Sequence, residues 1–255
     1  MLIDSHCHLD RLDLAPYDQD FSGFVRAARG QGVDHMLCVS ISLEAYPDML
    51  RLVEAHDCIS VSVGVHPNEQ DCQEPSVDEL VGLAHHPKVV AIGETGLDYF
   101  RSEGDLTWQH ERFRTHIRAA RQSGKPLIIH TREARADTLR IMEEEGAAEV
   151  GGVLHCFTED WETARRALEL NFYISFSGIV TFRNATQIQE VARKVPENRF
   201  LVETDSPYLA PMPHRGKPNY PLYVNHVAQF IADLRRIPVE QVAQLSTDNY
   251  HNLFG

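Results

Sequence analysis

Two histidines stand two residues apart near the start of the chain, at His6 and His8. They follow a short apolar stretch that predicts a β-strand, and side chains at positions i and i+2 of a strand point to the same face. Two imidazoles side by side at a strand end would pack poorly in an apolar core, but they could supply two of the ligands of a metal site. The pair alone also fits two solvated or buried histidines, so its interpretation depends on the rest of the chain.

Further histidines and carboxylates follow strand-like apolar runs along the chain. They are His66, Glu94, His130, His155 and Asp205. Each one singly fits a simpler interpretation: Glu94 could be a solvated strand end, and His130 or His155 a core histidine bonded to a backbone carbonyl. Together they would be costly to bury without partners. A divalent cation removes that cost, because neutral imidazole and ionised carboxylate are its ligands.

Strand-like and helix-like segments alternate along the whole chain, and this order predicts how those residues meet. The strand-like segments are the start of the chain up to residue 8 and residues 33–40, 59–65, 89–94, 126–130, 152–155, 172–176 and 200–205. Each is followed by a segment with the apolar spacing of a helix, and the last two helical segments are split near Pro238. Eight such units predict an α/β fold, a (β/α)8 TIM barrel that forms a single domain over residues 1–255.

Polar residues and a glycine predict where several of these helices begin and end. Asp18 is the expected cap of the first helix, and Ser76 with Glu79 forms a capping box for the third. Asn184 and Gln187 are expected to open the helix after residues 172–176 in the same way. Gly124 should end the long helix of residues 106–123.

The carboxyl ends of all strands of such a barrel face one mouth, so we expect the polar side chains to converge there. Six of them are candidate ligands: His6, His8, Glu94, His130, His155 and Asp205. Six donors exceed one tetrahedral site and suit two divalent cations about 3.5–4 Å apart. We expect Glu94 to bridge them, with His6, His8 and Asp205 around one and His130 and His155 around the other. Glu94 and Asp205 would then be the catalytic residues, Asp205 also accepting the proton of an attacking water.

Other residues near the mouth could contact the substrate. Arg132 could clamp an anion such as phosphate, or could be a surface arginine at a helix start. The proline-rich stretch from Pro207 to Pro221 is expected to shape the substrate entrance. The aromatic side chains of Tyr99, Phe157 and Tyr208 could either stack on a base or pack against the protein.

Composition and charge limit the classes of function. The formal net charge is −13, which disfavours a nucleic-acid binder with a broad basic patch but not a nuclease whose cations supply positive charge. The five cysteines are scattered without a CxxC pair, which favours a reduced, cytoplasmic protein. The first residues leave no room for a signal peptide, and no apolar run is long enough for a membrane span. We expect no contact with a membrane and find no sign of an obligate protein partner.

Motifs spread over nearly the whole chain resemble those of the TatD family of metal-dependent deoxyribonucleases. They are residues 4–10 (DSHCHLD), 63–67 (VGVHP), 92–98 (IGETGLD), 129–134 (IHTREA), 155–157 (HCF), 176–178 (FSG), 203–208 (ETDSPY) and 213–219 (PHRGKPN). One departure is Tyr220, where the family usually has Glu before the following proline. The resemblance implies a barrel with two divalent cations, Zn, Mn or Mg, held by the six ligands named above.

The same resemblance implies hydrolysis of the phosphodiester bonds of DNA, with single-stranded DNA favoured and often in the 3′→5′ exonuclease direction. His66 and Glu203 match family positions near the site, and we interpret them as supporting residues and not as ligands. Glu203 lies two residues before Asp205, so a regular strand would point both side chains into the barrel on the same side.

Three other interpretations fit part of the pattern. One is a two-metal barrel hydrolase of another ester, a lactone or an amide, although such relatives often use a lysine at the end of strand four or five and none stands there. The second is a non-catalytic metal-binding scaffold, which would need fewer ligands. The third is a metal-free glycosidase that uses Glu94 and Asp205, in which the four histidines would have no role.

Overall fold

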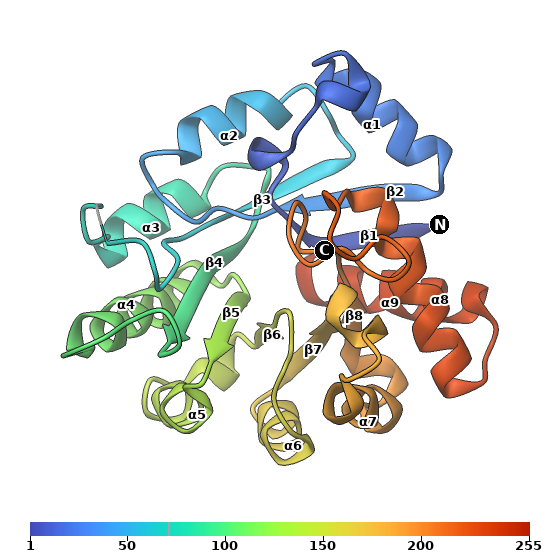
Figure 1. Cartoon of the computed structure of the whole chain (residues 1–255). Coiled ribbons are helices and arrows are strands. Elements are labelled where there is room, and N and C mark those ends of the chain that lie inside the picture. The colour runs from blue at the N-terminus through green and yellow to red at the C-terminus, as the bar shows by residue number, and fades with distance from the viewer. Residues whose placement is uncertain (71) are drawn as a thin grey trace.

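Eight parallel strands lie side by side in chain order and form the wall of a barrel (Figure 1). The computed structural model describes residues 1–70 and 72–255. The strands are β1 (Leu2–Cys7), β2 (Val33–Cys38), β3 (Ile59–Val63), β4 (Val89–Asp98), β5 (Leu127–Arg132), β6 (Gly152–Leu154), β7 (Phe172–Phe176) and β8 (Phe200–Val202). This order confirms the α/β barrel that the alternation of segments predicts.

Helices surround the strands on the outside, and Figure 1 shows one after each strand. They are α1 (Phe21–Gly30), α2 (Tyr46–Val53), α3 (Val77–Ala84), α4 (Thr107–Ser123), α5 (Arg135–Glu144), α6 (Trp161–Glu169), α7 (Thr186–Lys194), α8 (Val224–Arg235) and α9 (Val239–Phe254). Among residues 1–70 and 72–255, no helix has the length and apolar character needed to cross a membrane.

Two of the expected helix boundaries are confirmed and two are wrong. Ser76 caps α3 by accepting a hydrogen bond from the Glu79 amide, and Gly124 ends α4 in the left-handed region at φ 68°. Asp18 instead ends a short 3-10 helix at φ 54°, so α1 starts after Asp20. Helix α7 starts at Thr186 and not at Asn184, because the preceding residues form a turn.

The core has two layers, one between strands and helices and one inside the barrel. The inner layer takes one apolar residue from most strands and two from the last helix: Ile3, Leu37, Val39, Ala91, Ile128, Val153, Tyr173, Leu201, Tyr250 and Phe254. Tyr250 and Phe254 belong to the end of α9, and Figure 1 shows the C-terminus near the middle of the ring. The last turns of α9 therefore cover the barrel at the end opposite the carboxyl ends of the strands.

The seam between β1 and the segment after β8 closes the barrel. The Asp205 amide donates to the His6 carbonyl oxygen at 2.9 Å, and the His8 amide donates to the Ser206 carbonyl oxygen at 2.8 Å. The Asp4 carboxylate, fully buried in β1, accepts from both the amide and the hydroxyl of Thr204. The seam thus places His6, His8 and Asp205 on adjoining backbone.

Every strand except β7 ends at another residue than the sequence indicates, and β4, β6 and β8 show why. Strand β4 continues past Glu94 to Asp98, because its backbone goes on pairing with β5 up to the pair of Asp98 and Arg132. Strands β6 and β8 stop earlier, at Leu154 and Val202. Apolar patterning predicts where burial ends, whereas a strand ends where its ladder of backbone hydrogen bonds ends.

Candidate metal centre

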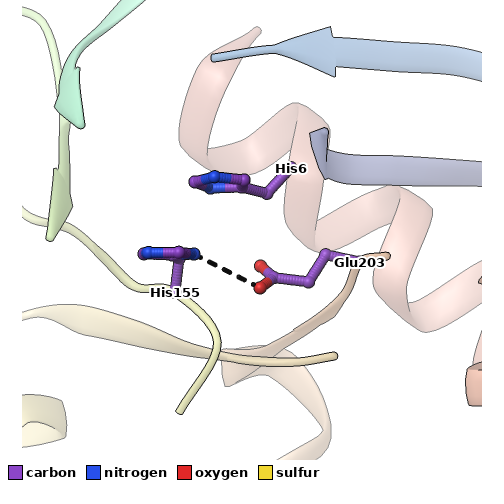
Figure 2. Close-up of side chains that lie close together, drawn as sticks. All are labelled: His6, His155 and Glu203. Carbon is purple, nitrogen blue, oxygen red and sulfur yellow. Dashed lines mark ion pairs between the residues drawn. The ribbon is translucent and has the colours of Figure 1, made fainter. Parts of the chain in front are cut away.

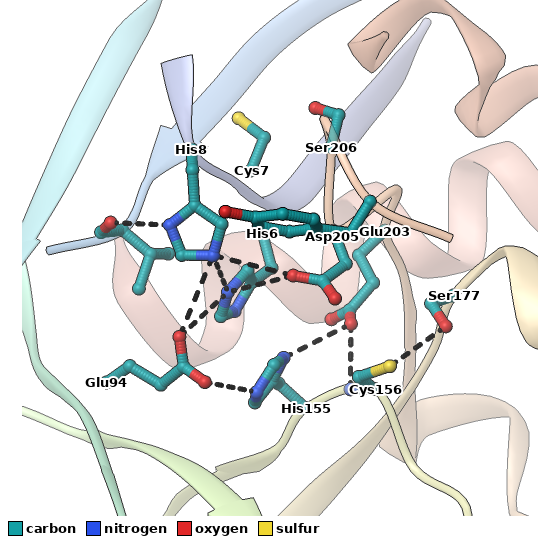
Figure 3. A network of polar contacts seen from close by, with 12 residues as sticks. His6, Cys7, His8, Glu94, His155, Cys156, Ser177, Glu203, Asp205 and Ser206 are labelled. Atoms are coloured by element: carbon teal, nitrogen blue, oxygen red, sulfur yellow. Dashed lines mark hydrogen bonds and ion pairs between the residues drawn. The ribbon is translucent and has the colours of Figure 1, made fainter. Parts of the chain in front are cut away.

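The carboxylate of Glu94 lies at the middle of a buried cluster of polar side chains in the barrel mouth. Strand β4 carries it inward, and its side chain is 3% exposed. Figure 3 shows one carboxylate oxygen turned toward His6 and His8 and the other toward His155. The two oxygens thus face two separate groups of donors, as a bridging carboxylate would.

The first group consists of His6, His8, Asp205 and the Oε2 atom of Glu94. Five separations among its four ligand atoms lie between 3.4 and 3.8 Å. Ligands bound tetrahedrally at 2.0–2.2 Å are about 3.3–3.6 Å apart, which follows from the geometry of a tetrahedron. The four atoms therefore have nearly the spacing that a single cation imposes, and they come from β1, β4 and the segment after β8.

The second group surrounds the Oε1 atom of Glu94 with three histidines. His155 Nε2 lies 2.8 Å away, and His66 Nε2 and His130 Nδ1 both lie 3.3 Å away. Glu94, His66 and His130 offer ligand atoms that are mutually close enough to hold a cation. His66 thus lies as close to the Glu94 carboxylate as His130 does. It is close enough to be a ligand, although the sequence analysis interprets it as a supporting residue.

Glu203 and His155 join the two groups to the end of β8. Figure 2 shows the His155 ring stacked parallel to the His6 ring, with one of its nitrogens turned toward the Glu203 carboxylate beside it. His155 Nδ1 lies 3.4 Å from Glu203 Oε1, and that oxygen also accepts the Cys156 amide at 2.7 Å. His6, His155 and Glu203 form a third set of atoms that could hold a cation.

Glu203 and Asp205 both point into the cluster, as expected, but from a turn and not from a regular strand, and they differ in most of their partners. Strand β8 ends at Val202, and Asp205 adopts a left-handed backbone conformation with φ 57°. Figure 3 shows Asp205 beside His6 and His8, while Glu203 contacts His155 and Cys156. The turn after β8 therefore lets two carboxylates two residues apart serve different parts of the cluster.

Fixed acceptors orient the histidine rings. His8 Nδ1 lies 3.0 Å from the Val39 carbonyl oxygen, which can only accept, so Nδ1 carries a proton and Nε2 is the nitrogen turned to the cluster. His130 Nε2 lies 3.1 Å from Asp98 Oδ2, so its Nδ1 faces Glu94. Each ring thus turns one nitrogen to the protein and one to the cluster.

Asp98 contacts the cluster through His130 and was not among the residues predicted from the sequence. Besides His130, its carboxylate accepts the Asn68 side-chain amide at 2.9 Å and the Phe100 and Arg101 amides at 3.0 Å. These donors hold the pKa of Asp98 below its usual range although burial opposes ionisation. The signal was present, because Asp98 lies four residues after Glu94 and a strand continued by four residues would put both on one face.

Charges within the cluster compensate one another. Burial opposes ionisation of Glu94, but the positive charges on His155 and His66 hold its pKa well below the usual value. Burial likewise disfavours a protonated His155, but Glu94 and Glu203 raise its pKa well above the usual value. Burial also opposes ionisation of Asp205, and a hydrogen bond from His8 still lowers its pKa. Protons on histidines thus balance the carboxylates, and a divalent cation could replace those protons.

Several buried atoms of the cluster make no hydrogen bond, as a cation site would require. They are His6 Nδ1, Glu203 Oε2 and both ring nitrogens of His155, which approach carboxylates without the angle of a hydrogen bond. Unpaired buried polar atoms are costly, and lone pairs that converge on a point between atoms are what a cation uses. The donors present therefore fit a divalent cation.

Arg132 lies at the rim of the mouth and not in the cluster. It ends β5 two residues after His130, and its guanidinium stacks over the Phe100 ring at 3.8 Å. Among the described residues, no carboxylate lies within ion-pair distance of it. Its charge is thus available to a ligand at the mouth.

The three aromatic residues near the mouth differ in what they contact. Phe157 is buried and belongs to the outer core, and the Tyr99 hydroxyl bonds to His110 and Asp137. Both therefore pack against the protein. Tyr208 is half exposed, and its ring centroid lies 6.0 Å from that of His8. The segment from Pro207 to Pro221 thus brings an open aromatic side chain to the cluster.

Comparisons with known proteins agree with this architecture. Residues 3–255 match the model of a family described as TatD related DNase. The uncharacterized metal-dependent hydrolase YcfH of Escherichia coli K12 is 51% identical over 254 residues, covering 99% of this chain and 95% of that protein. The uncharacterized metal-dependent hydrolase YabD of Bacillus subtilis is 40% identical over 255 residues, covering 100% and 99%. The crystal structure of YJJV, a TatD homolog from Escherichia coli K12, has a TM-score of 0.90 at 27% identity, covering 99% of this chain and 97% of that chain.

Proposed function

We propose, from the premise that this chain belongs to the TatD-related DNase family, that it cleaves the phosphodiester bonds of DNA with two divalent cations. At the coarser level it is a metal-dependent hydrolase of that family. The finer proposal is a 3′→5′ exodeoxyribonuclease that prefers single strands. It rests on the family description and on the chemistry of the cluster.

The observation that carries the two-cation proposal is the orientation of Glu94. Its Oε2 atom lies 3.4 Å from His6 Nε2, and its Oε1 atom lies 2.8 Å from His155 Nε2. A carboxylate with separate nitrogen donors on each oxygen suits two neighbouring cations better than one. We assign His6, His8 and Asp205 to one side of Glu94 and His130 and His155 to the other.

Divalent cations at such a site lower the pKa of a water and offset the charge that develops on phosphate oxygens. The chain's own residues supply the rest. Asp205 is ionised and its side chain is 13% exposed, more than those of His6, His8 and Glu94, so it is placed to accept the proton of an attacking water. Glu203 lies beside the ring of His155 as its charge partner, and the partly exposed His66 lies beside Glu94 Oε1.

Arg132 would bind the phosphate next to the bond that is cleaved. Its guanidinium matches two phosphate oxygens and has no carboxylate competitor among the described residues. The chain has a net charge of −13. A few positively charged side chains such as Arg132 are enough to bind phosphate, because bound divalent cations would supply most of the positive charge at the mouth. Zn or Mn suits the many imidazole ligands, and Mg is common in phosphodiester chemistry.

The test is hydrolysis of single-stranded DNA by chelator-stripped protein to which Zn, Mn or Mg is returned. We expect cleavage that depends on the metal. Asp205→Asn and Glu94→Gln should each reduce its rate by at least about 100-fold, because each substitution removes a metal ligand and Asp205→Asn also removes the proposed general base. Elemental analysis should give two metal ions per chain, and circular dichroism should give a native fold for both variants. Product ladders from 3′- and 5′-labelled strands report the polarity.

Three other results would contradict the proposal. Metal-restored hydrolysis of small carboxylic esters, lactones or amides, with no cleavage of DNA, would assign the site to another substrate. Tight metal binding with no hydrolysis of any ester would assign it to a scaffold. Near-normal turnover in both variants would contradict the assignment of Asp205 and Glu94.

A further inference from the structure

Exposed apolar side chains are concentrated at the mouth of the barrel. Four large hydrophobic residues are exposed among the described residues: Met1, Phe100, Tyr208 and Met212. Met1 is the chain terminus, and the other three lie on the loops that follow β4 and β8. A soluble surface usually scatters such residues, so their location beside the candidate metal centre points to a ligand with apolar faces.

Phe100 is fixed next to one side of the cluster. Its amide donates to Asp98 Oδ1 at 3.0 Å, and Asp98 Oδ2 lies 3.1 Å from His130 Nε2. The Arg132 guanidinium covers one face of the ring at 3.8 Å, yet the side chain remains 56% exposed. The ring therefore offers an open face, backed by a cation that can reach a phosphate.

Tyr208 is fixed next to the opposite side. Its amide donates to the Asp205 carbonyl oxygen at 2.9 Å, and its ring lies edge-on to His8. The Asn219 side chain holds the backbone on either side by donating to the carbonyl oxygens of Thr204 and Tyr208. Tyr208 is 49% exposed, so its ring is held in place while a large part of it stays open to solvent.

The two aromatic residues thus flank Glu94, Phe100 on the side of Oε1 and Tyr208 on the side of Oε2. A phosphate at the cluster would have its neighbouring nucleotides on these two sides. Stacking needs a free base face, and bases inside a duplex have both faces covered by their neighbours. Two open rings on either side of the candidate metal centre therefore fit unpaired nucleotides.

We propose that Phe100, backed by Arg132, and Tyr208 stack on the unpaired bases that flank the cleaved phosphate, and that they restrict the substrate to single strands. The inference rests on the proposed function, because it presumes a nucleic-acid substrate. Phe100 and Tyr208 are specificity residues and take no part in the bond cleavage itself.

Binding of two labelled oligonucleotides to the metal-loaded full-length protein tests the proposal. One is a single strand of thymidines and the other an abasic strand of equal length, both with phosphorothioate linkages to slow hydrolysis. Wild type should bind the thymidine strand more tightly. Phe100→Ala and Tyr208→Ala should each weaken that binding by about 5- to 150-fold, the range for loss of one stacked base, and bind the abasic strand almost as wild type does.

Conservative and matched variants separate stacking from damage to the fold. Phe100→Tyr and Tyr208→Phe keep a ring and should retain the preference for bases. Arg132→Ala should weaken binding of both strands, because it removes a phosphate contact. The matched control is Arg199→Ala, which removes a guanidinium stacked on Tyr173 near the opposite end of the barrel and should change neither affinity.

Equal affinity of wild type for the two strands would overturn the proposal, as would equal weakening of both by Phe100→Ala and Tyr208→Ala. Cleavage of unmodified DNA is measured separately. Cleavage without a preference for bases overturns the stacking role and leaves the proposed function standing. A preference for the thymidine strand without cleavage of DNA in the presence of any of the metals overturns the proposed function and leaves the stacking role standing.

Discussion

At the scale of single residues, two histidines of the cluster use their two ring nitrogens for different purposes. His8 and His130 direct one nitrogen to a protein acceptor, the Val39 carbonyl oxygen and Asp98 respectively, and the other to the cluster. This arrangement fixes both the tautomer and the angle of the ring before any cation binds. The ligand side chains therefore lose their conformational entropy during folding and not during metal binding. This favours tight and specific binding of a cation.

Asp98→Asn should weaken metal binding by about 10- to 100-fold. The amide is a poorer hydrogen-bond acceptor for His130 than the carboxylate, so it no longer raises the basicity of the imidazole ring. Isothermal titration of stripped protein with Zn or Mn measures the affinity. The matched control is Asp105→Asn in the same loop, where the carboxylate bonds only to Thr107. An unchanged affinity for Asp98→Asn would show that Asp98 supports the loop and not the ligand.

At the scale of elements, β4 and β5 approach so closely at the cluster that one position excludes a side chain. Gly96 lies between Glu94 and Asp98 at φ 131°, and a Cβ atom there would lie 2.0 Å from the His130 carbonyl oxygen. Both the conformation and the close approach require glycine. The spacing of Glu94 and His130 therefore depends on the absence of a side chain at Gly96.

Gly96→Ala should lower the free energy of unfolding by about 2 kcal/mol or more, because it adds overpacking to backbone strain. It should also weaken metal binding, since His130 is displaced. Gly82→Ala on α3 is the control: nothing lies within 4 Å of the added Cβ, so stability should rise by about 0.5–1 kcal/mol. Urea denaturation measures both, and a stable Gly96→Ala variant would contradict the prediction.

Helix α4 supports the loop that carries His66 through a buried histidine. His116 Nδ1 lies 2.8 Å from the Arg112 carbonyl oxygen, and its Nε2 accepts the Val65 amide at 3.0 Å. Both nitrogens are satisfied only when the ring is neutral. Burial, the main cause, lowers the pKa of His116 to about 4.

Stability should therefore depend on pH through His116. Between about pH 6.5 and pH 4 the unfolded chain binds a proton on this side chain and the native chain does not, so the free energy of unfolding falls as pH falls. His116→Gln keeps a donor and an acceptor but cannot titrate. We expect it to flatten the decline by up to about 3 kcal/mol. Chemical denaturation at several pH values measures the slope, and equal slopes would contradict the role of His116.

At the scale of the whole molecule, the candidate metal centre spans the seam that closes the barrel. His6 lies in β1, His8 directly follows this strand, and Asp205 belongs to the segment after β8, which a few backbone hydrogen bonds join to the first segment. A cation bound by these three residues would link the first strand to the last. Metal binding would therefore reinforce the closure of the barrel that these backbone hydrogen bonds already make.

Metal loading should raise the melting temperature of the whole chain. A cation at about 100 times its dissociation constant stabilises the native state by about 2.7 kcal/mol, which corresponds to roughly 5–10 °C at this size. The shift should shrink from pH 8 to pH 6. Although burial opposes their protonation, carboxylate neighbours raise the pKa of His130 and His155, so protons compete with the cation as pH falls. Calorimetry with and without chelator measures the shift, and Asp205→Asn should reduce it.

The barrel and most of the residues that meet in its mouth could be predicted from the amino-acid sequence. Strand and helix periodicity is local, and parallel strands of a barrel must align their carboxyl ends, so residues such as His6 and His155 had to converge. The family motifs added the expectation of a metal-dependent nuclease. Helix ends with a strong local signal, such as Ser76 and Gly124, were also predicted correctly.

Only the tertiary structure decided the orientation of groups within the mouth. Strand β4 runs on to Asp98 because β5 pairs with it, and the turn after β8 separates Glu203 from Asp205. The stacking of Arg132 on Phe100 and the burial of Phe157 depend on neighbours that are distant in sequence or on the path of a loop. Local patterns carry the periodicity of an element, whereas register, backbone turns and side-chain partners are set by contacts between elements.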